Sequence, residues 1–138
     1  MKTELIQRAV VFAQKAVDIE PNHGSYWNTL GVAHYRIGDW QTAIGTLEKS
    51  DELSKGDFLG FNGFFLATAH WQLGHQDEAH QHYQESVDWM KKHMPDDEEL
   101  RRFRAEAAEL LGMPVETNKP AEKPEKTETK ERQAEKKQ

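Results

Sequence analysis

The chain has 138 residues, a formal net charge of -6 and no cysteine. This length suits one domain, and the acidic balance argues against a nucleic-acid surface, which needs a basic stripe. The lack of cysteine excludes disulfides and thiolate metal sites. No apolar run is long enough to span a membrane, and the charged N-terminal segment lacks the pattern of a signal peptide. We therefore expect a cytoplasmic protein that binds neither nucleic acid nor a membrane.

The first helix is predicted over residues 3–19. Six apolar residues recur there at helical spacing: Ile6, Ala9, Val10, Ala13, Ala16 and Val17. A second stripe, formed by Leu5, Phe12 and Ile19, follows another side of the helix at seven-residue spacing. An apolar stripe of this kind needs a cover. We expect either self-association through the stripe or that the chain is a piece of a longer array.

The next two helices are predicted over residues 25–37 and 39–53. Ser25 suits the N-cap of the first helix, because a serine hydroxyl accepts a hydrogen bond from a backbone N–H of the first turn. Gly38 suits a left-handed C-cap, and Asp39 suits the N-cap of the second helix. The short connection predicts a tight helix–turn–helix pair.

Residues 55–63 are predicted to be irregular, because they carry three glycines and two phenylalanines. The phenylalanine rings either fill a gap between helices or form a flexible lip beside a peptide groove. Three further helices are predicted over residues 63–73, 76–93 and 96–111. Asp96 with Glu99 indicates a capping box at the start of the last one. Residues 113–138 are highly charged and carry no aromatic residue, so they are predicted to be a disordered charged tail.

Equivalent residues recur along the chain at the spacing of a helical-hairpin repeat. Seven residues of one pair of helices have a counterpart in the next pair: Ala33, His34, Tyr35, Gly38, Ala43, Leu47 and Ser50 correspond to Ala69, His70, Trp71, Gly74, Ala79, Tyr83 and Ser86. Towards the N-terminus, three of them have earlier counterparts: Ala43, Leu47 and Ser50 correspond to Ala9, Ala13 and Ala16.

This pattern resembles the tetratricopeptide repeat. The matching positions of the middle repeat are Trp27, Leu30, Gly31, His34, Ala43, Leu47 and Ser50. The sequence departs from the family at His34, where Tyr is usual, at Ser50, where Ala is usual, and at Gly63, which takes the Trp position of the next repeat. The resemblance implies an all-α fold over residues 1–112, a right-handed solenoid of helical hairpins with about 2.5 repeats and a C-terminal capping helix.

The resemblance also implies a function in protein–protein interaction. In this family the first helix of each pair lines a concave face, which binds a peptide or a partner protein. The predicted groove residues are Asn28, Thr29, Val32, Tyr35, Arg36, Phe64, Phe65, Thr68, Trp71 and Gln72. An aromatic, weakly charged lining suits an apolar or extended peptide. The alternative is that Tyr35 and Trp71 only pack between repeats.

No motif for catalysis is present: there is no phosphate-binding glycine loop, GxSxG, HExxH or cysteine nucleophile. We therefore expect no enzyme and no cofactor. The segments AHYRIGDW and AHWQLG are also similar to the repeat regions of large bacterial serine/threonine kinase-associated proteins, so a regulatory fragment of such a protein is one alternative function.

A small metal- or ligand-binding helical protein is the other alternative. His75, Glu78 and His82 share one helix face and are the candidates for a metal site. The repeat register turns that face to solvent, and we expect no metal there. His34 and His70 occupy equivalent positions inside apolar faces, where they are either packed, hydrogen-bonded histidines or the basis of a pH-responsive core.

Overall fold

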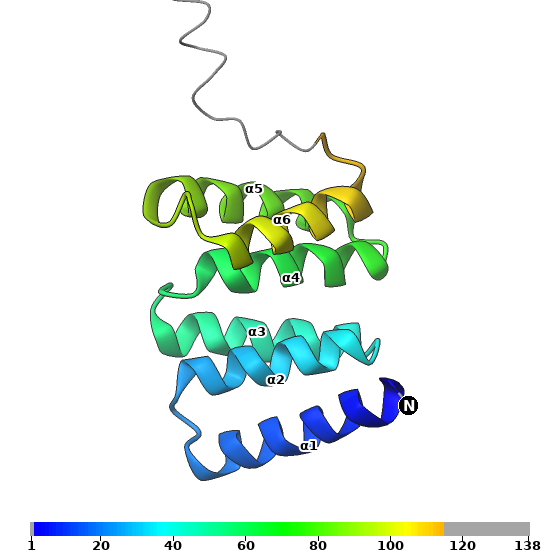
Figure 1. Ribbon diagram of the computed structural model, residues 1–138, viewed down its shortest axis with the longest axis vertical. Coiled ribbons are helices and arrows are strands. Elements are labelled where there is room, and N and C mark those ends of the chain that lie inside the picture. Colours follow the sequence, from blue (N-terminus) through cyan, green and yellow to red (C-terminus); the bar gives the residue numbers. More distant parts are fainter. Residues whose placement is uncertain (1, 115–138) are drawn as a thin grey trace, which may run out of the picture.

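The computed structural model describes residues 2–114, and every regular element among them is an α-helix (Figure 1). The elements are α1 (Lys2–Ile19), α2 (Gly24–Arg36), α3 (Trp40–Ser54), α4 (Leu59–Gln72), α5 (Gln76–His93) and α6 (Glu98–Leu111). The all-α fold class is therefore confirmed. No helix within the described residues combines the length and apolar character that crossing a membrane requires.

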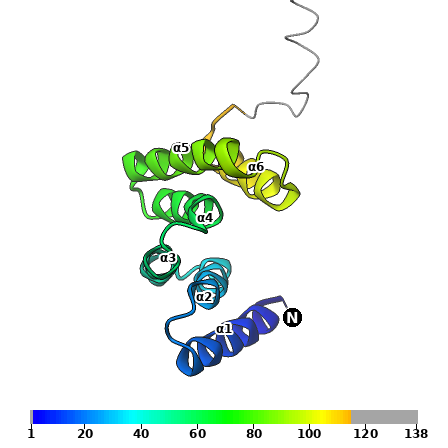
Figure 2. The same cartoon turned by 90° about the vertical axis from the view of Figure 1, so that its left-hand side faces the viewer.

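The helices stack in chain order from α1 to the pair formed by α5 and α6 (Figure 1). Short turns join α2 to α3 and α4 to α5, so each of these pairs is an antiparallel hairpin. Figure 2 shows α2 and α6 on the same side of the stack, with α4 at the level between them. This arrangement places three helix ends around one hollow, which is the candidate site described below.

The helix ends follow local rules, with two corrections. As predicted, the Asp39 carboxylate caps α3 by accepting a hydrogen bond from the N–H of Thr42 at 3.4 Å. The prediction of Ser25 as the N-cap of α2 is wrong, because the helix already begins at Gly24. At α6 the cap is Asp97, whose carboxylate accepts from the N–H of Leu100 at 2.9 Å, and not the predicted Asp96.

The start of α4 is the largest correction to the predicted helix boundaries. The helix begins at Leu59, although residues 55–63 were expected to be irregular. Gly60 and Gly63 lie inside α4, where a Cβ atom would collide with Trp89 and Ser86 of α5. These glycines therefore permit close helix packing and do not mark a loop.

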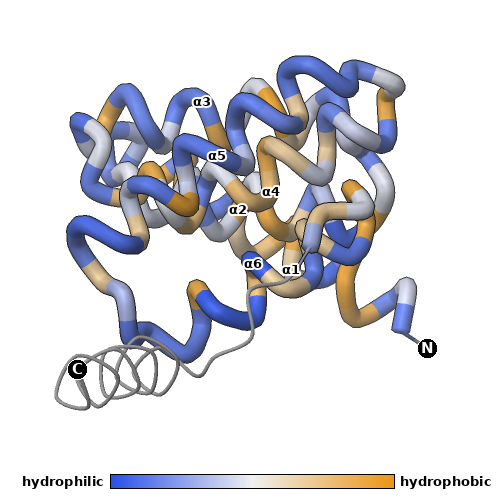
Figure 3. Tube along the Cα trace, turned by 90° about the horizontal axis from the view of Figure 1, so that it is seen from above, coloured by the Kyte–Doolittle hydropathy of each residue, from blue (hydrophilic) through white to orange (hydrophobic). Residues whose placement is uncertain are grey.

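The central helix α4 is almost entirely buried. Nine of its residues are buried, including Phe64, Phe65 and Leu66, and Figure 3 shows it as a mainly hydrophobic segment among more hydrophilic helices. A helix that is apolar all round belongs in the middle of a packed structure. Phe61 at its N-terminal end packs edge-on against Trp89, with ring centroids 6.2 Å apart, which favours the packing role expected for these rings.

A polar network joins α4 to the preceding hairpin. The Asn62 side chain is fully buried, and its amide nitrogen donates to Ser50 Oγ at 3.0 Å and to Asp51 Oδ1 at 2.8 Å. Its amide oxygen accepts from Asn28 Nδ2 at 2.6 Å, while Ser50 Oγ donates to the carbonyl of Gly24 at 2.8 Å. A buried amide with every polar atom paired fixes the helices around it in one register.

The helical body extends slightly beyond the predicted boundary. The N–H of Met113 donates to the carbonyl of Ala108 at 2.8 Å, and the side chain packs against the core of α4, α5 and α6. Met113 therefore belongs to the helical body and not to the tail predicted over residues 113–138. The rest of that prediction, residues 115–138, lies outside the described part of the chain.

Candidate functional site

The C-terminal parts of α2, α4 and α6 line one hollow, and Figure 2 shows these three helices at successive levels of the stack. Its lining consists of Tyr35 from α2, Gln72 from α4, and Glu106, Glu109 and Leu110 from α6. One aromatic ring, one amide, two carboxylates and one aliphatic side chain thus face a shared surface. This combination can pack against the carbon chain of a bound segment while its carboxylates interact with positive charge.

Beside this hollow, Arg36 of α2 contacts Glu106 of α6. Its guanidinium lies 5.8 Å from the ring centroid of Tyr35 and 5.5 Å from that of Phe65. One of its nitrogens also lies 3.4 Å from a carboxylate oxygen of Glu106. A guanidinium beside the hollow therefore lies against two of its lining residues, an aromatic ring and a carboxylate, as in a cation–π contact.

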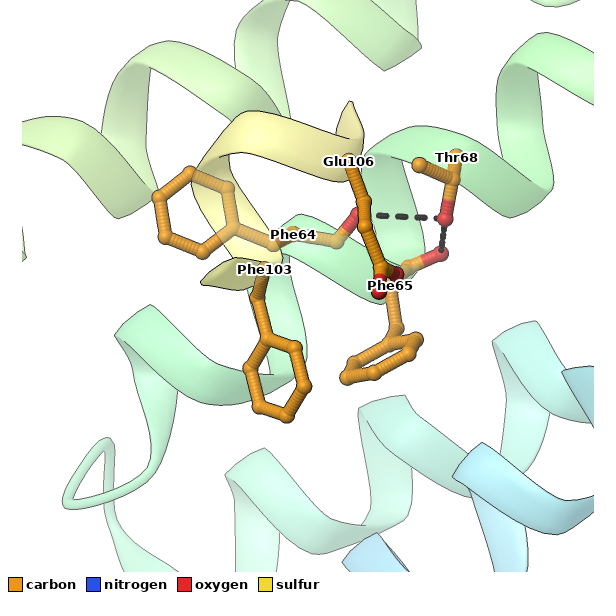
Figure 4. A pocket seen from close by; sticks show the side chains of 5 residues that line it. All are labelled: Phe64, Phe65, Thr68, Phe103 and Glu106. Carbon is orange, nitrogen blue, oxygen red and sulfur yellow. Dashed lines mark hydrogen bonds between the residues drawn. The ribbon is translucent and has the colours of Figure 1, made fainter. Parts of the chain in front are cut away.

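The floor beneath the hollow is closed by aromatic packing. Figure 4 shows a small enclosed pocket whose walls come from α4 and α6, with the rings of Phe65 and Phe103 side by side beneath Glu106. These two rings pack edge-on with centroids 4.7 Å apart. Thr68 Oγ1 donates to the carbonyls of Phe64 at 3.2 Å and Phe65 at 2.9 Å.

Part of the predicted groove lining is thereby corrected. Phe64, Phe65 and Thr68 were expected to face a partner, but their exposed fractions are only 1%, 3% and 5%. They are buried because α6 folds over the face of α4 that a more open stack would leave free. Phe64 also packs against Tyr83, with ring centroids 5.8 Å apart, so it serves the core.

The remaining predicted lining residues separate into two groups. Tyr35 and Gln72 line the hollow, and Arg36 contacts Tyr35 beside it. Four others point elsewhere or serve packing: Asn28, Thr29, Val32 and Trp71. Asn28 belongs to the Asn62 network, and the Thr29 hydroxyl donates to the Ser25 carbonyl at 3.1 Å. Val32 packs against the core that contains Leu47, and the Trp71 ring lies against His80 with ring centroids 5.8 Å apart.

The carboxylates of the hollow were not identified from the sequence. Glu106, Glu109 and Leu110 were not among the predicted groove residues. The available signal was their spacing, because Glu106, Glu109 and Leu110 are three and four residues apart and so share one face of α6. Which neighbour that face meets depends on the direction in which α6 folds back, and the spacing does not determine this.

Three histidines, His70, His75 and His82, lie together near the turn between α4 and α5. His70 Nδ1 lies 3.1 Å from His75 Nδ1, and the His70 ring stacks on His82 with centroids 5.2 Å apart. Burial lowers the pKa of His70, the positive charges of His82 and His75 lower it further, and Glu78 opposes them. These side chains include the three metal candidates His75, Glu78 and His82. Over residues 2–114, no group of three or more His, Asp or Glu side chains is arranged to hold a metal ion.

Comparison with known proteins leaves the family open, since no protein-family model matches the chain and no curated protein is significantly similar to it.

Proposed function

We propose that the chain is a helical-repeat module of the tetratricopeptide type that binds a segment of a partner protein in the hollow between α2, α4 and α6. The observation that carries the proposal is the hollow itself, lined by side chains from three helices that are far apart in the sequence. Such a surface on a rigid scaffold suits recognition of an extended segment or a protruding side chain.

The repeat interpretation is supported by equivalent contacts in the two hairpins. The carbonyl of His34 accepts from the N–H of Asp39 at 2.9 Å, and the carbonyl of His70 accepts from the N–H of His75 at the same distance. Each histidine ring also faces the residue five positions later, since His34 Nδ1 lies 3.6 Å from Asp39 and His70 Nδ1 lies 3.1 Å from His75. Residues that correspond in sequence thus have corresponding surroundings.

The small residues of the repeat give the same support. Ala43 and Ala79 correspond to each other, as do Ser50 and Ser86, and all four are fully buried. Their burial is expected where the two helices of a hairpin approach closely, because a larger side chain would push the backbones apart.

The chemistry of the hollow favours a partner segment that carries Lys or Arg. Glu109 and Glu106, the latter paired with Arg36, line the hollow together with Tyr35, and Leu110 offers an apolar contact for the carbon stem of a long side chain. An apolar peptide was expected when Phe64 and Phe65 were thought to be exposed. Since both are buried, the partner proposed here is basic.

A displayed library of random peptides tests this proposal. We expect selection on the wild-type protein to enrich Lys and Arg, and Tyr35→Ala to weaken the best peptide by about fivefold or more, as at a central aromatic contact. Glu109→Gln should weaken it less, and the effect should shrink at high salt. Glu48→Gln, an exposed position on α3, is the matched control. Binding that is equally strong in wild type and Tyr35→Ala would contradict the proposal.

The two alternatives from the sequence remain without a supporting contact. No interaction among the described residues favours a kinase-associated regulatory role over general partner binding. The histidine group at the α4–α5 turn, which motivated the metal-binding alternative, brings two imidazole nitrogens close together but does not assemble a third ligand.

A further inference from the structure

The outer face of α1 carries a line of exposed apolar side chains. Leu5, Phe12 and Ile19 are exposed to 64%, 67% and 79%, and they follow one another at seven-residue spacing. Single exposed apolar residues are common, but a line of three along one helix is the pattern of a helix-packing face.

The centre of the same face is buried in the equivalent helix α3, whereas Asp39, the counterpart of Leu5 at its start, is exposed. The repeat that relates Ala9 and Ala16 to Ala43 and Ser50 also relates Phe12 to Thr46 of α3. In α3 these positions are buried, with Ala43 and Ser50 fully so and Thr46 at 7%. There Ser50 Oγ donates to the Gly24 carbonyl of α2 at 2.8 Å. The corresponding part of α1, at Ala9 and Ala16, therefore carries the small residues that let a second helix approach closely.

The charges beside the stripe indicate which helix this is and in which direction it runs. If the stripe of Leu5, Phe12 and Ile19 forms the centre of a helix–helix contact, two basic residues lie along one side of it. These are Arg8 and Lys15. Glu20 lies on the other flank, and its N–H still donates to the Ala16 carbonyl at 2.9 Å, so the helical turn continues to it. In a parallel pair of identical helices, Lys15 of each copy comes beside Glu20 of the other.

An antiparallel pair would be opposed by the same charges. Centred on Phe12, it would place Arg8 of one copy beside Lys15 of the other, twice over. Like charges at these flanking positions destabilise the pairing, and opposite charges support it. The parallel arrangement also brings Leu5, Phe12 and Ile19 each against its own counterpart.

We propose that this stripe is the contact face of a parallel, two-fold dimer in which α1 packs against α1 of a second copy of the chain. The contact is isologous, so each copy contributes the same residues and the assembly closes at two subunits. Ala9 and Ala16, beside the stripe, allow the two backbones to approach closely. The proposal is independent of the hollow between α2, α4 and α6.

Sedimentation equilibrium and light scattering on the full chain test the dimer. We expect the mass of the wild type to rise from one to two chains with concentration, and the melting temperature to rise with it. Phe12→Glu should give a monomer that keeps the wild-type circular dichroism spectrum, because this side chain is exposed within its own chain. Val11→Glu is the matched control, since Val11 is 53% exposed on the same helix but off the stripe.

Cross-linking tests the direction of the pair and does not depend on Phe12→Glu folding. The chain has no cysteine, so Ile19→Cys introduces a single thiol. In a parallel dimer the two thiols face each other within disulfide distance, and we expect oxidation to give a covalent dimer, whereas Val11→Cys should not. In an antiparallel pair only the double variant Leu5→Cys/Ile19→Cys would cross-link, which would overturn the proposed arrangement.

A charge exchange completes the test. Lys15→Glu should weaken the dimer by about fivefold, because exposed ion pairs contribute little each. Adding Glu20→Lys should restore it, since the pair is then reversed and not lost. A wild type that stays monomeric at every concentration, or a Val11→Glu variant as disruptive as Phe12→Glu, would overturn the proposal and assign the stripe to another occupant.

Discussion

The helices at the two ends of the described stack, α1 and α6, differ in what their free faces carry. α6 buries Leu100, Ala107 and Leu111 against α4 and α5, and its other side is charged. α1 buries only Ala13 and Val17 against α2 and leaves its large apolar side chains outside. One end of the described stack therefore has a polar outer face, and the other exposes a line of apolar side chains.

This difference locates the two surfaces on which the molecule is proposed to act. By folding over α4, the C-terminal helix closes the aromatic floor and brings Glu106 and Glu109 to the hollow. At the N-terminal end, the face of α1 stays uncovered within residues 2–114 and is proposed to pair with a second copy. The proposed binding of a partner and the proposed pairing of two chains thus lie at separate places and can be lost separately.

The largest expected effect on the free energy of unfolding comes from truncating a leucine to alanine, and it should differ between the two ends of the stack. Leu100→Ala removes a fully buried side chain from the core under α6, and should lower the free energy of unfolding by about 2–5 kcal/mol. Leu5→Ala removes an exposed side chain from α1 and should change it by less than about 0.5 kcal/mol in dilute solution. Urea denaturation of both variants measures the difference, and equal losses would contradict the contrast between the ends.

The Asn62 network, which joins α4 to the preceding hairpin, should give the next largest effect on the free energy of unfolding. Asn62→Ala leaves Asn28 and Asp51 without their buried partner, and should cost about 2–3 kcal/mol. Thr29→Ala, at an exposed position of α2, is the control and should cost little. A two-step denaturation curve for Asn62→Ala would show that α1–α3 and α4–α6 can unfold separately once the network is lost.

A smaller effect is expected for the contact that ties α6 to α2. Arg36 and Glu106 are both well exposed, with side-chain exposures of 42% and 54%. A double-mutant cycle with Arg36→Gln and Glu106→Gln should therefore give a coupling energy below about 1 kcal/mol. A larger coupling would mean that this ion pair, and not apolar packing, holds α6 in place.

The smallest predicted effect concerns pH at the α4–α5 turn. The pKa of His70 is lowered from 6.5 by burial and by the neighbouring charges of His82 and His75. In the unfolded chain His70 takes up its proton at a higher pH than in the folded chain, so protons favour unfolding. Its contribution to stability is complete above pH 6.5 and is lost as the pH falls towards the lowered folded value.

Melting temperatures of wild type and His70→Asn across this range measure that contribution. The variant should lose less stability than the wild type on acidification. His23→Asn, at the start of α2 and away from the histidine group, is the control and should follow the wild type. Parallel curves for wild type and His70→Asn would contradict the prediction.

Local features of the fold could be predicted from the sequence, and the packing of α6 could not. Asp39 and Gly38 are adjacent residues whose roles depend only on their own turn, and both act as predicted. The start of α4 was not predicted, because Gly60 and Gly63 suggest a loop in the sequence. In the structure they are helical and make room for Trp89 and Ser86. A glycine that serves a close contact and a glycine that serves a turn are the same letter in a sequence.

The candidate site was only partly predicted for a related reason. Tyr35 and Gln72 line one hollow, and repeat spacing could indicate this because it fixes their faces on α2 and α4. Phe65 was placed on the same surface, but α6 covers it, and the direction in which the last helix folds back is a long-range property. The same fold-back brought Glu106 and Glu109 into the site.

The Asn62 network has a consequence for how the hairpins recognise each other. Its amide can satisfy Asn28, Ser50 and Asp51 together only when α4 lies at one height along α3. If the second hairpin shifted by one helical turn, much of the apolar contact would remain, but three polar groups would be buried without hydrogen-bond partners. Burying unpaired polar groups costs free energy. The hydrogen bonds of the Asn62 amide thus select one position of α4 along α3, which apolar contacts alone would not specify.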